Sequence, residues 1–468
     1  MTDVQRPALQ GPSKLYRFVW RWHFYAGLFA APILIMLAVT GGLYLFEREL
    51  DGLLHPQAVT AAGTGPAKPL AVQQAAVLAA YPNARIGRYV EPVGPSRAAE
   101  WGITTARGKN LAVFVDPASA AVTGSVPESE RLTSILSKLH GELMIGFVGD
   151  LIVELAASWG FILLVSGLFL WWPRRTRRAG VLIPDLQRRG RSLMRDLHAV
   201  PAFWVAPVIA FLILTGLPWS GFWGDNLARL GTVEALAPAL APTPNFSAAP
   251  DAPPHHPPEP ADAGSHEGHH PFADELPWAV RHASVPQPAS GASVAPGFDA
   301  DALRTLAAMR GMAQPRLRIF FPQGQGGVFT ASFIPDQAQR QRTLYVDPAS
   351  GAVLADIGWP QYSPLGKVVE FGVMVHLGRQ FGRANQVVLA AICAGFVAII
   401  AFGLCAWWMR RPAGQIGAPS LPEDYRATGV VVAIAVVLGL LFPLAGLSML
   451  AMAAADQVVV RHRRATAS

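Results

Sequence analysis

The sequence has little cysteine and little charge. Only two of its 468 residues are cysteines, and both lie in one apolar run. In a helix, the twelve residues from Cys393 to Cys405 would span about 18 Å, far beyond disulfide reach. Disulfides and cysteine-ligated iron–sulfur clusters are therefore excluded. Charged residues make up 15% of the chain and hydrophobic residues 51%, with a mean hydropathy of +0.31. This composition is too apolar for a soluble enzyme and indicates a membrane protein.

Three further absences narrow the function. No Gly-x-Gly-x-x-Gly motif follows a predicted strand, so we expect no flavin or NAD site. The apolar runs lack the paired carboxylates of an ion pathway, since Glu47, Asp150 and Glu154 lie only at their ends. The net charge of +7 comes mostly from arginines beside apolar runs, which is typical of membrane proteins, so we expect a lipid partner and no nucleic-acid partner.

Four apolar runs are long enough to cross the hydrocarbon core, which takes about 20 residues. They lie near residues 24–46, 151–172, 201–223 and 387–409. A fifth run, at about residues 430–460, is longer but is interrupted by Phe442, Pro443 and Gly446. It is compatible with either one kinked span or a shallow hairpin.

Basic residues predict the orientation. Arg6, Lys14, Arg17 and Arg21 precede the first run, and eight arginines lie in residues 173–197. The positive-inside rule places both segments in the cytoplasm. We therefore expect a multi-pass protein of the bacterial inner membrane, with a cytoplasmic N-terminus and large periplasmic segments.

The expected fold is an α-helical membrane bundle with two periplasmic α+β modules and an internal duplication. Its predicted parts are a cytoplasmic N-terminus (1–19), a first span (20–46), a first module (47–139), an outer histidine segment with the second span (140–172), an arginine-rich loop (173–197), a third span (198–223), a histidine- and proline-rich segment with a disordered insertion (224–296), a second module (297–375), an outer histidine segment with the fourth span (376–409), a loop (410–428), a fifth span or hairpin (429–460) and a basic tail (461–468).

The two outer segments share a plan. In each, an amphipathic helix precedes alternating apolar stretches that predict strands. The helices are expected at 71–81 and 300–309, and the strands at 85–90, 100–105, 111–115, 316–321, 327–333 and 343–346. The sequence Phe114-Val-Asp-Pro-Ala-Ser-Ala-Ala-Val122 returns as Tyr345-Val-Asp-Pro-Ala-Ser-Gly-Ala-Val353, and in both Asp-Pro predicts the turn of a hairpin.

One histidine lies near the start of each of the four spans. They are His23, His140, His198 and His376. Because alternate spans run in opposite directions, His23 and His198 are expected at the cytoplasmic end and His140 and His376 at the outer end. Two imidazoles facing each other across a bundle can ligate a six-coordinate haem b, which transfers electrons. The pattern therefore predicts two haem b groups, with the histidines as ligands of their iron.

Each of these assignments has a plainer alternative. Histidines near helix ends are common at the membrane interface. Arg21 and Arg195 could bind haem propionates, although an interfacial belt explains Trp-Trp-x-Arg-Arg sequences as well. A tract of histidines could bind a transition metal or form part of a disordered linker. Its members are His255, His256, His266, His269 and His270. Small residues would let a macrocycle approach a helix, or would serve helix packing equally. These are Gly27, Gly146, Gly149, Gly160, Gly167, Gly378 and Gly382.

Several motifs resemble a known family. Arg21-Trp-His-Phe-Tyr-Ala-Gly27, Thr40-Gly-Gly-Leu-Tyr-Leu-Phe-Glu47, Leu139-His-Gly141, Asp196-Leu-His198 and Leu441-Phe-Pro-Leu-Ala-Gly446 resemble the PepSY-associated transmembrane proteins. That family includes iron-regulated membrane proteins and ferrisiderophore reductases. The resemblance covers nearly the whole chain. It implies two haem b groups, two periplasmic PepSY modules, and electron transfer to ferric siderophores.

The leading hypothesis is thus an oxidoreductase that passes electrons through the two histidine pairs to a periplasmic ferric siderophore. There would be no catalytic acid or base, and the donor would be a cytoplasmic reductase or quinol. One alternative is a non-catalytic scaffold whose modules bind a periplasmic partner. The other is a metal transporter or sensor that uses the histidine-rich tract.

Overall fold

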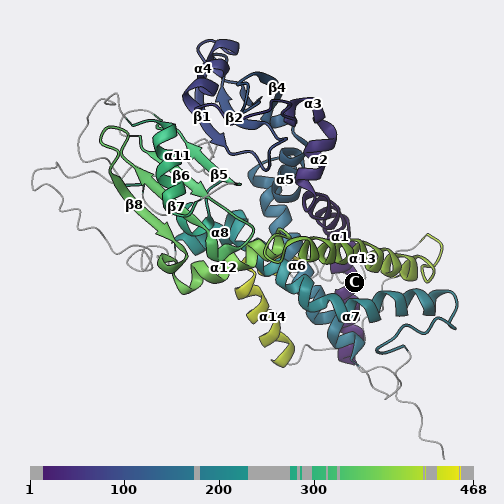
Figure 1. Cartoon of the computed structure of the whole chain (residues 1–468). Coiled ribbons are helices and arrows are strands. Elements are labelled where there is room, and N and C mark those ends of the chain that lie inside the picture. The colour runs from purple at the N-terminus through teal and green to yellow at the C-terminus, as the bar shows by residue number, and fades with distance from the viewer. Residues whose placement is uncertain are drawn as a thin grey trace, which may run out of the picture. The chain divides into compact units, whose positions relative to one another are not determined.

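The chain forms two compact units. The first combines residues 1–43, 137–223 and 388–468, and the second combines residues 44–136 and 224–387. The computed structural model, drawn in Figure 1, describes residues 14–172, 180–229, 275–281, 285–286, 298–312, 315–323, 327–414, 417, 429–452 and 454.

The first unit is built on long apolar helices. Among the described residues, four helices are long and apolar enough to cross a membrane, in agreement with the four predicted spans. They are α1 (Lys14–Tyr44), α6 (Phe147–Trp171), α7 (Arg191–Gly216) and α13 (Gly382–Trp408), whose first turns lie in the second unit. Both α1 and α7 begin about ten residues before the apolar runs that predicted them, so His23 and His198 lie inside these helices.

The fifth apolar run folds back on itself. Helix α14 (Gly429–Leu441) ends before Phe442, and a second short apolar helix covers Pro443–Met452. A Cβ atom built on Gly446 would lie 2.8 Å from the Cα atom of Gly439. Seven residues along one straight helix are about 10.5 Å apart, so the two arms must cross at these glycines. Of the two predicted alternatives, the structure has the hairpin.

Two contacts from α6 hold the second arm and the turn of the hairpin. The indole Nε1 of Trp159 donates a hydrogen bond to Ser448 Oγ at 3.1 Å. The ring of Phe161 packs on Phe442, with their centroids 5.1 Å apart. Because Pro443 has no N–H, starting the second helix there removes one of the donors that a helix N-terminus leaves unpaired.

We expect Gly446→Leu to destabilise the protein, because the new side chain would collide with the backbone of Gly439. Overpacking of this kind costs about 1–3 kcal/mol. The measurement is unfolding of the detergent-purified protein by sodium dodecyl sulfate. Gly429→Leu is the matched control, since a Cβ atom there meets nothing within 4 Å. Equal losses in the two variants would contradict the crossing.

The second unit contains one antiparallel sheet of eight strands in the order β4-β3-β2-β1-β5-β6-β7-β8 (Figure 1). The strands are β1 (Arg85–Val90), β2 (Ala99–Thr104), β3 (Asn110–Val115), β4 (Val122–Pro127), β5 (Leu317–Phe320), β6 (Phe329–Phe333), β7 (Arg342–Val346) and β8 (Val353–Gly358). Three residue pairs between β1 and β5 join the two four-stranded halves.

Helices cover both faces of this sheet. Helices α4 (Leu70–Ala80) and α11 (Ala300–Met309) pack on one face, where alternate strand residues such as Trp101, Ile103, Ile319 and Leu344 form the main core. The other face packs on short or partly polar elements. These are α3 (Pro56–Val59), α10 (Trp278–Arg281) and α12 (Pro364–His376). Helix α2 (Glu47–Leu54) carries Asp51, which pairs with Arg131, and α5 (Leu132–Glu142) begins at the next residue.

The two halves of the sheet have matching turns, as predicted. The N–H of Asp116 donates to Ala121 O at 2.9 Å, and the N–H of Asp347 donates to Ala352 O at the same distance. Each aspartate side chain accepts from the N–H two residues on, also at 2.9 Å. The six predicted strands are present, with bounds that shift by up to two residues. The sequence prediction missed β4 and β8, whose Val-Thr-Gly-Ser and Val-Leu-Ala-Asp sequences alternate weakly because both are edge strands.

A network of buried charges lies on the face of the sheet opposite the main core. Arg88 pairs with Glu275, with Glu100, and with Glu128 at 2.7 Å. Arg131 contacts Glu100 at 3.0 Å and Asp51 at 2.7 Å. This network connects β1 and β2 to three segments outside the sheet.

Glu100 makes the stability of this unit depend on pH. Burial alone would raise its pKa, but Arg131 and Arg88 lower it from 4.5 to about 2. A depressed carboxyl pKa stabilises the fold above 4.5, and this contribution is lost as the pH falls toward 2; its full size is about 3 kcal/mol. Hydrogen exchange of residues 85–104 between pH 5 and 2 should show this loss, and the slope should flatten in Glu100→Gln. An unchanged slope in the variant would contradict the assignment.

Candidate functional site

The four predicted histidines lie on four helices. His23 lies in α1 and His198 in α7, both in the first unit, which is called the membrane unit below. Their imidazole rings lie next to each other, with centroids 6.4 Å apart and ring planes at 69°. His140 lies near the end of α5 in the same unit, and His376 is the last residue of α12 in the second unit. All four side chains are partly buried.

The spacing of His23 and His198 matches that of two ligands on one metal ion. An imidazole nitrogen lies about 2.0 Å from a bound first-row metal, and the ring centre lies about 1.1 Å further back. Two imidazoles on opposite sides of one ion therefore have centroids about 6.2 Å apart. The observed 6.4 Å agrees with this value.

Ser166 fixes the tautomer of His23. Its hydroxyl lies 2.9 Å from His23 Nδ1 and donates its own hydrogen to Ile162 O at 2.8 Å. A serine that gives its one hydrogen to Ile162 O accepts from the imidazole. In this arrangement Nδ1 of His23 is protonated, and Nε2 keeps its lone pair for another partner.

His198 has the same tautomer for a simpler reason. Its Nδ1 lies 2.8 Å from the carbonyl oxygen of Ile399 in α13, and a carbonyl can only accept a hydrogen bond. Nε2 of His198 therefore also keeps its lone pair. Both members of the pair present an unprotonated nitrogen, which is the form that a metal binds.

Thr40 orients His140 in the way that Ser166 orients His23. The Thr40 hydroxyl donates to Met36 O at 2.8 Å and lies 2.9 Å from His140 Nδ1, so the imidazole is the donor. His140 too keeps the Nε2 lone pair. His376 ends its helix just before Gly378, whose φ of +70° turns the chain toward α13.

A glycine lies against each of the imidazoles of His23, His140 and His198. A Cβ atom on Gly41 would lie 3.1 Å from His140 Cε1, one on Gly167 3.2 Å from His23 Cε1, and one on Gly403 2.8 Å from His198 Nδ1. In each case the missing side chain leaves the space that the ring occupies. The rings are therefore positioned by complementary shape as well as by hydrogen bonds.

The donor set fits an axially ligated haem. Two neutral imidazoles have free Nε2 atoms, hydrogen-bonded Nδ1 atoms, and the separation that a shared iron requires. Among the described residues, no group of three or more His, Cys, Asp and Glu side chains could hold a metal ion. A pair of axial ligands needs only two, because a macrocycle supplies the other four donors.

Comparison with protein families adds an independent observation: the family description "PepSY-associated TM region" matches residues 20–410. The chain belongs to this family. The match covers α6, α7, α13, all of α1 from residue 20 on, and the four predicted histidines, whereas the hairpin of α14 lies beyond it. The search of curated proteins gave no match.

In this PepSY-associated protein, the two arginines predicted to bind propionates have other contacts. The guanidinium of Arg21 lies 5.1 Å from the ring centroid of Tyr25, and Arg195 Nη2 lies 3.0 Å from Asp196 Oδ1. In the second Trp-Trp-x-Arg-Arg sequence, the guanidinium of Arg410 lies over the ring of Trp20, 4.8 Å from the ring centroid. The tract His255, His256, His266, His269 and His270 lies outside the described residues.

The residues that orient the imidazoles could not be recognised as a group from the sequence. Ser166, Ile399, Gly41 and Gly403 were not predicted as site residues, and only Gly167 was named among the small residues near the site. One signal was present: a hydroxyl residue followed by glycine occurs at Thr40-Gly41, Ser166-Gly167 and Thr215-Gly216. Gly403 follows Phe402 rather than a hydroxyl residue, because the backbone carbonyl of Ile399 accepts the hydrogen bond of His198. The sequence therefore carries no such signal at Gly403.

Proposed function

We propose that the protein is a dihaem b electron-transfer protein that reduces a ferric chelate outside the cytoplasm. The observation that carries this proposal is the facing pair of neutral imidazoles of His23 and His198, each with its Nδ1 hydrogen bonded and its Nε2 lone pair free. Such iron has no open position, so it carries single electrons and does not bind oxygen.

The protein's own groups prepare this site. Ser166 Oγ and Ile399 O hold the two rings in one tautomer, so no proton must leave an imidazole before it ligates iron. The glycines beside the rings allow the α1, α6 and α13 helices to approach them closely. Preorganised ligands of this kind also limit movement of the site when its charge changes.

We assign the second haem to His140 and His376 from the sequence repeat. His140 has the same tautomer as the inner pair, set by Thr40. Two haems at two depths would divide the roughly 30 Å of hydrocarbon core into shorter electron-transfer steps. In this proposal the N-terminus is cytoplasmic and His140 and His376 lie near the periplasmic side of the inner membrane.

The substrate in this proposal is a ferric siderophore. One electron reduces each ferric ion to the ferrous state, which the hard oxygen donors of such chelators hold less tightly, so the iron is released. The electron comes from a quinol, which gives two electrons and two protons, or from a cytoplasmic reductase. We also assign the two halves of the sheet to PepSY modules that arose by duplication, since their turns and registers match.

Optical spectra and haem quantification test the proposal. Detergent-purified protein from haem-replete cells should contain two b-type haems that dithionite reduces. His23→Ala and His198→Ala should each lose the same haem, and His140→Ala and His376→Ala the other. His55→Ala is the matched control, because His55 lies between α2 and α3 and should leave both haems in place. A colourless wild-type protein would overturn the proposal and favour a scaffold.

A further inference from the structure

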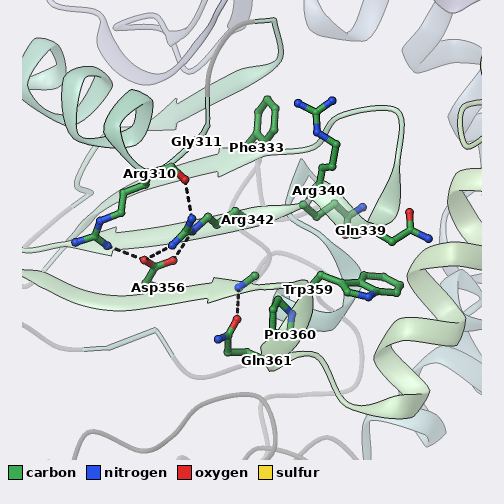
Figure 2. Close-up of a pocket in the computed structure, with 12 residues that line it drawn as sticks. Arg310, Gly311, Phe333, Gln339, Arg340, Arg342, Asp356, Trp359, Pro360 and Gln361 are labelled. Atoms are coloured by element: carbon green, nitrogen blue, oxygen red, sulfur yellow. Dashed lines mark hydrogen bonds and ion pairs between the residues drawn. The ribbon is translucent and has the colours of Figure 1, made fainter.

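A pocket of about 440 Å³ lies in the second half of the sheet (Figure 2). It is lined by Arg310 and Gly311 after α11, by strand β7 and the edge strand β8, and by the short turns that flank them. Its volume is in the range of sites for small molecules. The charged residues that line it are Arg310, Arg340, Arg342 and Asp356.

Three guanidinium groups and one carboxylate give this pocket an excess of two positive charges. Asp356 holds Arg342 through two contacts, of 2.7 and 2.8 Å, and Arg310 through one of 2.6 Å (Figure 2). Arg310 thus uses one of its five N–H donors on Asp356, and its side chain is 34% exposed. Within the described residues, no carboxylate pairs with the exposed Arg340.

The held guanidiniums are preorganised. Arg342 Nη1 donates to the carbonyl oxygen of Arg310 at 2.6 Å, which fixes its plane in addition to the two contacts with Asp356. These contacts hold the pKa of Asp356 below its ordinary value, although partial burial opposes this, so the carboxylate stays charged. Arginine donors fixed in one plane suit the two oxygens of a carboxylate.

The first half of the sheet has uncharged residues at the positions that correspond to Arg310, Arg342 and Asp356, whereas Lys109 corresponds to Arg340. Leu111 pairs with Pro127 in β3 and β4, as Arg342 pairs with Gly358 in β7 and β8. In the same register Ser125 corresponds to Asp356. The C-cap residue of α4 is Tyr81, and the C-cap residue of α11 is Arg310.

The two halves even share the contact between these residues. Tyr81 Oη donates to Ser125 Oγ at 2.8 Å in the first half, where Arg310 contacts Asp356 in the second. A neutral hydrogen bond is therefore sufficient to hold this sheet architecture together. The fold itself does not require the charges of the pocket.

Uncharged groups complete the pocket. Gln361 Oε1 accepts from the N–H of Gly358 at 3.0 Å, which leaves the amide N–H groups of this side chain available as donors. Trp359 adds a flat apolar side chain to the lining (Figure 2). We propose that this pocket binds a small polycarboxylate, with Arg310 and Arg340 as its main charge partners and Arg342 as a fixed donor.

Isothermal titration of the full-length protein with iron-free citrate tests this site without any redox readout. Arg340→Gln should weaken binding about 10-fold, as the loss of one charge-assisted hydrogen bond does. The triple variant Arg310→Tyr, Arg342→Leu, Asp356→Ser carries the residues of the first half, so it should fold, and it should weaken binding about 100-fold or more. Lys109→Gln is the control for loss of one positive charge and should bind as the wild type does.

Two results would overturn the proposal. One is a wild-type protein that does not bind citrate, which would mean that Asp356 already saturates the arginines. The other is inorganic phosphate that binds more tightly than citrate, which would contradict the assignment to polycarboxylates. Circular dichroism of the triple variant checks that its fold is intact.

Discussion

Gly403→Leu is expected to remove about half of the haem from the purified protein, although residue 403 is itself no ligand. A Cβ atom at this position would lie 2.8 Å from His198 Nδ1 and 3.0 Å from its Cε1, so the ring must move. The movement breaks the hydrogen bond from His198 to Ile399 O and carries Nε2 away from the shared axis with His23. In the proposed function, a haem that lost one of its two histidine ligands would be weakly held.

The same helix provides a matched control for this prediction. Gly395 lies eight residues earlier in α13, and a Cβ atom there meets nothing within 4 Å. Both substitutions raise helix propensity by a similar amount. Pyridine haemochrome analysis should therefore separate the two variants at equal protein yield. If both retain all their haem, the glycine does not position the ligand and the proposed site is wrong.

The second large effect is expected for stability, in the buried charge network of the sheet. Arg88 is 7% exposed and contacts the carboxylates of Glu100, Glu128 and Glu275. Arg88→Met would leave these groups without their shared cation in a site that water reaches poorly. Removing one partner from a buried ion pair costs about 3–5 kcal/mol.

Hydrogen exchange of the β1 and β2 amides measures this loss. Arg85→Met, at the exposed first position of the same strand, should change stability by less than about 0.5 kcal/mol. Arg88→Lys should recover only part of the loss, because an ammonium group cannot bind several carboxylates in one plane. Equal protection in Arg88→Met and Arg85→Met would show that the network contributes nothing to stability.

Much of the architecture could be predicted because it depends on local pattern. The long apolar runs identify the four spans, and the repeated Asp-Pro turns identify the hairpins at Asp116 and Asp347. The hairpin of the fifth run could not be decided, because Pro443 is compatible with a kink as well as a turn. The choice depends on contact between Gly439 and Gly446, which no local pattern encodes.

In the candidate site, too, the features set by local sequence were predictable and those set by distant contacts were not. The histidines were recognisable from their repeated position, whereas their partners are distant in sequence: Ser166 is 143 residues from His23, and Ile399 is 201 residues from His198. The polar residues of the sheet were harder still to recognise from the sequence. Nothing in the sequence separates the paired Arg342 from the many arginines at membrane boundaries, because only the register of β7 and β8 places it beside Asp356.

The groups behind the imidazoles have a consequence for the reduction potential. His23, His198 and His140 are supported by a serine hydroxyl, a backbone carbonyl and a threonine hydroxyl, all of which are uncharged. A carboxylate in that position would give the ring imidazolate character and favour oxidised iron. With neutral supports the ring donates less electron density, so the ferrous state is favoured. The proposed centres should therefore have a higher midpoint potential than carboxylate-supported ones, and Ser166→Asp should lower the potential of the His23 centre.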